Sequence, residues 1–92
     1  MKSIREELKS LGITLESRYM IYTAEDRTLV IPYYHIRTLE LKNDKVIIQT
    51  GSVEKIVIHL PSDTLANILF EELLLHIERI YLSLPLWQVL WI

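Results

Sequence analysis

The chain contains no cysteine, and it has only two glycines and three prolines among its 92 residues. Without cysteine, a disulfide framework, a thiolate nucleophile and a thiolate metal site are all excluded. Gly12 and Gly51 stand alone, so the sequence has neither a glycine-rich phosphate loop nor a Gly-x-Ser-x-Gly nucleophile turn. Two Gly, two Gln, two Asn and no Cys, beside many Ile, Leu, Glu and Tyr, also hint at a thermophilic source.

Neither sign of charge dominates the chain. Ten Lys and Arg face twelve Asp and Glu, which gives a net charge of −2. This balance provides no general attraction to nucleic acid or to an anionic membrane, so such a partner would need a local basic patch. The longest uncharged run, residues 80–92, is too short to span a bilayer, and the first residues lack the apolar stretch of a secretory signal. We therefore expect a cytoplasmic protein.

A long amphipathic helix is predicted over residues 62–84. Ser62 and Asp63 follow Pro61, which places a capping residue and an acid at the start of the helix. Apolar residues then recur at intervals of three and four, at Leu65, Leu69, Leu73, Ile77, Ile80 and Leu84. Further apolar residues, among them Phe70, Leu74 and Tyr81, widen the arc beyond one packed face. We expect the helix to be covered on two sides, by the sheet and by a second subunit or the chain's own tail.

The remaining pattern predicts an α+β fold in a single domain, residues 1–92. A capping box at Ser3–Glu6 begins a short helix over residues 4–11, which Gly12 ends in a left-handed conformation. Alternating apolar residues between turn signals then predict strands at about residues 18–23, 28–31, 36–42, 46–50 and 55–60. We expect one antiparallel sheet of four or five strands, with the short N-terminal helix and the long C-terminal helix packed on it.

The stretch from residue 85 to residue 92 is apolar and contains two tryptophans, which need a cover. It could fold back over its own sheet or first helix, form a dimer contact, or bind a membrane surface or another partner. Our leading hypothesis is a homodimer, with an interface formed by the long helix and this tail. The residues assigned to the interface are Phe70, Leu74, Tyr81, Trp87, Leu90 and Trp91.

The sequence offers no constellation for catalysis. His35, His59 and His76 do not form the close pair of ligands that a metal site on one element needs. Glu72 and His76 are one helical turn apart and are interpreted as a surface pair. The adjacent carboxylates, such as Glu71 and Glu72, point in different directions and serve as solubilising charges. We expect no enzyme, no metal and no cofactor.

Four basic residues, Arg37, Lys42, Lys45 and Lys55, could meet at one end or side of the sheet. If they converge beside Tyr33, Tyr34 and His35, they would suit phosphate groups or acidic partners. The alternative interpretation is that they are dispersed and protect strand edges from aggregation.

The order of these segments resembles the second half of a PH-like domain of the bacterial PH or GRAM-like type. The resemblance covers about residues 18–82 and rests on a stretch from Ile31 to Ile36 of the form Ile-Pro-Tyr-x-x-Ile, the hairpins that follow it, and the final helix. The chain departs from that pattern in its N-terminal helix and in having fewer strands than a full barrel. The resemblance implies binding rather than catalysis. It supports the alternative function, in which the basic residues bind anionic lipid headgroups or nucleic acid.

Overall fold

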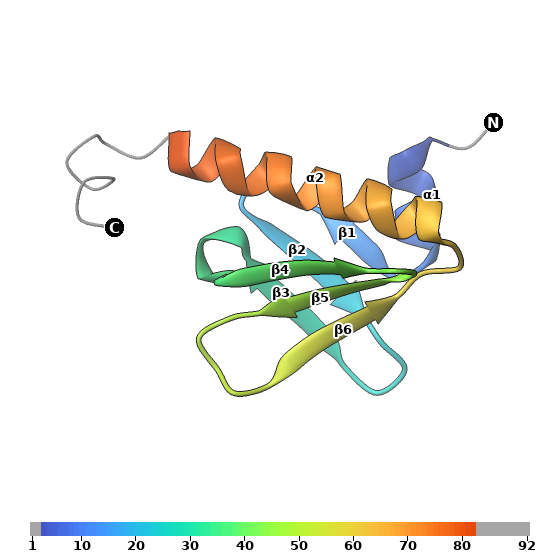
Figure 1. The fold of residues 1–92 in the computed structure, drawn as a ribbon, viewed down its shortest axis with the longest axis horizontal. Coiled ribbons are helices and arrows are strands. Elements are labelled where there is room, and N and C mark those ends of the chain that lie inside the picture. Colours follow the sequence, from blue (N-terminus) through green and yellow to red (C-terminus); the bar gives the residue numbers. More distant parts are fainter. Residues whose placement is uncertain (1–2, 83–92) are drawn as a thin grey trace.

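The computed structural model describes residues 3–82, which form two helices, six strands and a short 3₁₀ turn. Helix α1 (Ile4–Ser10) precedes strands β1 (Ile13–Leu15), β2 (Tyr19–Thr23) and β3 (Thr28–Pro32). The 3₁₀ turn η1 (Tyr33–His35) leads to strands β4 (Thr38–Lys42), β5 (Lys45–Gln49) and β6 (Lys55–His59), and helix α2 (Asp63–Leu82) follows. Figure 1 shows α2 running alongside both groups of strands, with α1 near the beginning of α2.

Both helices begin at serine caps. The Ser3 hydroxyl accepts a hydrogen bond from the Glu6 amide at 3.2 Å, and the Ser62 hydroxyl accepts one from the Leu65 amide at 3.2 Å. Each cap satisfies an amide that the first turn of a helix leaves without a partner. Gly12 follows α1 with a φ of +84°, where a Cβ atom would lie 2.5 Å from the Thr23 carbonyl oxygen. This glycine therefore allows the chain to turn directly from α1 into β1.

The strands form two separate antiparallel sheets, so the prediction of one sheet with four or five strands is wrong. In the described residues the first sheet has the order β1-β2-β3 and the second β4-β5-β6. Pro32 ends β3 without an amide donor, and η1 then turns the chain away before β4 begins. The sequence analysis also missed β1, because three residues are too few to show a clear alternation. The overall class is α+β.

The two sheets and α2 share one core. Each sheet contributes buried residues from its inner face, such as Met20 and Ile31 from the first and Val46 and Ile48 from the second. Helix α2 contributes Ala66, Leu69 and Leu73, and α1 contributes Leu8. None of the helices in the described part of the chain is long and apolar enough to cross a membrane.

Candidate functional site

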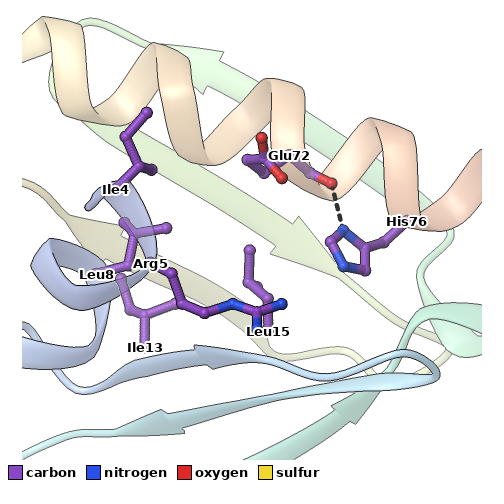
Figure 2. Close-up of a pocket in the computed structure, with 7 residues that line it drawn as sticks. All are labelled: Ile4, Arg5, Leu8, Ile13, Leu15, Glu72 and His76. Carbon is purple, nitrogen blue, oxygen red and sulfur yellow. Dashed lines mark hydrogen bonds between the residues drawn. The ribbon is translucent and has the colours of Figure 1, made fainter.

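A pocket lies between α1, β1 and α2 (Figure 2). A first hollow of about 160 Å³ is lined by Ile4, Leu8, Ile13 and Leu15, which form its apolar end, and by Arg5, Glu72 and His76. A second hollow of about 290 Å³ shares Arg5, Leu15 and His76 with the first and is also lined by Glu16, Ser17 and Arg79. Because these hollows share three residues, we describe them as one pocket, the α1–α2 pocket, with an apolar end and a polar end.

His76 lies where the two ends of the pocket meet, and its side chain is buried, with 7% of the residue exposed. Its Nδ1 atom lies 2.8 Å from the backbone carbonyl oxygen of Glu72, one turn earlier in α2. Since a carbonyl oxygen can only accept, Nδ1 must carry the proton. The Nε2 atom has no hydrogen-bond partner among the described residues. Every fully buried side-chain nitrogen or oxygen in those residues does have a partner, so Nε2 is not fully buried. We conclude that Nε2 is open to the pocket.

The ring of Tyr33, from η1, packs against the ring of His76. The two ring centres are 5.0 Å apart and the ring planes are inclined by 43°. The Tyr33 hydroxyl donates a hydrogen bond of 2.6 Å to the backbone carbonyl of Glu16, which fixes the start of the β1–β2 turn. Burial raises the pKa of Tyr33, the nearby Glu16 carboxylate raises it further, and Arg5 opposes the shift. Tyr33 thus stays neutral and orients His76.

The pocket is also lined by charged side chains. Arg5 and Arg79 supply two positive charges, and Glu16 and Glu72 supply two negative ones. Neither arginine forms an ion pair within residues 3–82. The ion pair found in that range joins Arg27 Nη2 to Glu54 Oε1 at 2.7 Å. Figure 2 shows the Arg5 side chain extending from α1 toward the His76 ring on the opposite side of the pocket. Two guanidinium groups that have no ion pair within the described residues therefore line the same pocket as His76.

The interpretation of Glu72 and His76 as a surface pair is wrong. His76 is buried and bonds to the backbone of Glu72, while its ring packs on Tyr33, 43 positions earlier in the chain. A histidine among the apolar positions of the helix was the one available signal, but its aromatic partner is not predictable from local spacing. The described residues contain no group of three or more His, Asp or Glu side chains that could hold a metal ion.

The residues predicted to form an interface are divided between the described helix and the tail. Leu74 is 39% exposed, whereas Phe70 and Tyr81 are half-buried, and Phe70 packs against the core. The most exposed apolar residues of α2 are two that the sequence analysis did not assign to the interface, Leu75 at 43% and Leu82 at 83%. Trp87, Leu90 and Trp91 lie outside the described residues.

The four basic residues lie toward opposite ends of the second sheet. Lys42 pairs with Lys45 at the β4–β5 hairpin. Near the other end of β5, Gln49 accepts a hydrogen bond from the Arg37 amide and pairs with Lys55. Lys45 and Gln49 are four positions apart, or about 14 Å along the strand. The structure does, however, place His59 opposite Lys45, so Lys42, Lys45 and His59 form a row across three strands.

In comparisons with known proteins, no family model, no curated protein and no solved structure matches this chain. The resemblance to PH-like domains therefore remains a prediction.

Proposed function

We propose that this protein is a small non-enzymatic interaction module that associates with a second copy of itself through the outward side of α2. The observation that carries the proposal is the exposure of Leu74, Leu75 and Leu82 on a helix whose inner side is already fully packed. Exposed apolar side chains grouped on one element favour an interface, because each loses contact with water when a partner covers it.

The spacing of this surface favours a second copy as the partner. Ile68, Leu75 and Leu82 are seven residues apart, close to two helical turns, so they form one stripe along α2. In a two-fold antiparallel pair, Ile68 would face Leu82 of the partner, and Leu75 would face its own counterpart. Such a stripe is complementary to itself, as the interface of a symmetric dimer must be.

Glu71 and Glu78 flank Leu75 on the outward side of the helix and are both exposed. Their repulsion across the pair would weaken it, so we expect a reversible dimer rather than a permanent one. In this proposal Trp87, Leu90 and Trp91 extend the apolar surface and tighten the dimer, and the protein acts in the cytoplasm.

Light scattering coupled to size-exclusion chromatography tests the proposal. The full chain should have twice the 10.9 kDa mass of one copy, and Leu75→Ser with Leu82→Ser should give a folded monomer. The variant Trp87→Ser with Trp91→Ser should have an intermediate apparent mass if the tail assists. A monomeric full chain at concentrations up to about 1 mM, where a dimer would gain only about 4 kcal/mol, would refute self-association.

A second candidate, the PH-like binding of anionic groups, is favoured by the row of Lys42, Lys45 and His59. Like charges directly opposite each other on neighbouring strands destabilise a sheet, so a bound anion would relieve the repulsion. Binding to anionic vesicles or oligonucleotides that falls with added salt, and that Lys42→Gln with Lys45→Gln weakens, would support this function. Arg37→Gln is the control, because Arg37 lies at the other end of β5.

A further inference from the structure

We propose that the α1–α2 pocket binds a small carboxylic acid whose apolar part is about the size of a benzene ring. Ile68, Leu75 and Leu82 of the proposed dimer surface do not line the pocket, and Arg5, which would recognise the ligand, lies on α1. The two proposals can therefore fail independently.

The apolar end of the pocket determines the size of the ligand's body. Leu8, Ile13 and Leu15 are buried residues of the core, and the half-exposed Ile4 forms part of the rim. A protein cavity of about 150 Å³ lined by aliphatic side chains can hold a benzene molecule. The hollow that contains this apolar end has a volume of about 160 Å³, so it has room for a single ring or a short branched chain.

The junction between the two ends determines the chemistry of the ligand's head. Arg5 has no ion-pair partner among residues 3–82 and extends toward the open Nε2 of His76. A guanidinium binds a carboxylate with two parallel hydrogen bonds, which fixes the orientation of the ligand. Arg79 lines the polar end and adds a second positive charge.

The acidic residues favour a single negative charge on the ligand. Glu16 and Glu72 balance the charges of Arg5 and Arg79, so the lining as a whole has no excess of positive charge. A monoanionic carboxylate can pair with Arg5, whereas a phosphate dianion brings a second negative charge into a lining that has no excess positive charge to offset its desolvation. This balance distinguishes a carboxylate site from a phosphate site.

Nuclear magnetic resonance titration of the ¹⁵N-labelled full chain with 3-phenylpropionate tests the proposal. We expect shifts at residues lining the pocket, Leu15 and His76 among them, with a dissociation constant on the order of 1 mM. The neutral probe 3-phenylpropanamide should bind about tenfold more weakly, because it lacks the charge that Arg5 recognises. Phenyl phosphate should also bind more weakly.

Matched variants complete the test. Arg5→Gln should weaken binding of 3-phenylpropionate about tenfold, whereas Lys9→Gln, which removes the same charge from α1 outside the pocket, should leave it unchanged. Leu75→Ser with Leu82→Ser should bind as the unmodified chain does, whatever its oligomeric state. The proposal is overturned if no pocket residue shifts at about 20 mM probe, if the amide or the phosphate binds as tightly, or if Arg5→Gln and Lys9→Gln behave alike.

Discussion

The two sides of helix α2 show how one run of apolar residues divides into two roles. On the inner side Leu69 and Leu73 are completely buried. On the outer side Leu75, two positions after Leu73, is 43% exposed, and Leu82 is 83% exposed. Both sides are rich in leucine, so composition does not distinguish them. The direction that each residue faces places the inner side in the core, and in our proposal the outer side forms the dimer contact.

The largest effect should come from removing an inner leucine. Leu73→Ala deletes buried methyl groups and leaves a cavity in the core, so we expect the free energy of unfolding to fall by about 3 kcal/mol. Leu75→Ala is the matched variant and should change the stability of the monomer by no more than about 0.5 kcal/mol. Urea denaturation of both variants at low protein concentration measures the difference, and equal losses of stability would show that the two sides of α2 do not differ in burial as described.

The inner side also depends on Tyr33, which packs on His76. Tyr33→Phe removes the hydroxyl that donates to the Glu16 carbonyl and should cost about 1 to 2 kcal/mol. The pKa of Tyr33 is raised in the folded state above its ordinary value of 10.0, so the neutral form stabilises the fold below that pH. The stability due to this group should therefore decline as the pH rises above about 10.

Denaturation at pH 7 and pH 11 checks this pH dependence. Tyr33→Phe should lose less stability between the two pH values than the unmodified chain does. A pH dependence that is the same in both proteins would show that Tyr33 does not contribute through its ionisation.

The outer side should respond to charge with little change in stability. Glu71→Gln with Glu78→Gln removes the repulsion beside Leu75, and we expect the dimer affinity to rise about fivefold. Glu25→Gln with Asp26→Asn removes the same two charges from the exposed β2–β3 loop and should have no such effect. Sedimentation equilibrium measures both constants, and an unchanged affinity in the α2 variant would place the dimer contact elsewhere.

Local features were predictable from the sequence because their causes are local. Ser3 and Ser62 mark the starts of helices by capping them, and Gly12 adopts the left-handed conformation that its position suggested. The division into two sheets was not predictable, because it depends on how Pro32 and η1 redirect the chain and on a three-residue strand that only pairing defines.

The pocket depends on contacts that are distant in the sequence. Tyr33 reaches both Glu16 and His76, and α1 supplies Arg5 to a site whose other wall is α2. The spacing along α2 predicted the inner positions Leu69 and Leu73 correctly, but it assigned His76 to the surface. Local periodicity could not reveal that an aromatic ring from η1 covers this histidine.

The most direct test of self-association uses the absence of cysteine in the natural sequence. Leu75→Cys places a single thiol where the proposed two-fold axis crosses α2, and Val53→Cys places one on a residue that is 98% exposed in the β5–β6 loop. Under mild oxidation at low protein concentration, we predict that the Leu75→Cys chains form a covalent dimer much faster, because the two thiols already face each other. Faster dimerisation of the more exposed Val53→Cys chains would show that only random collisions join them, and would contradict an interface on α2.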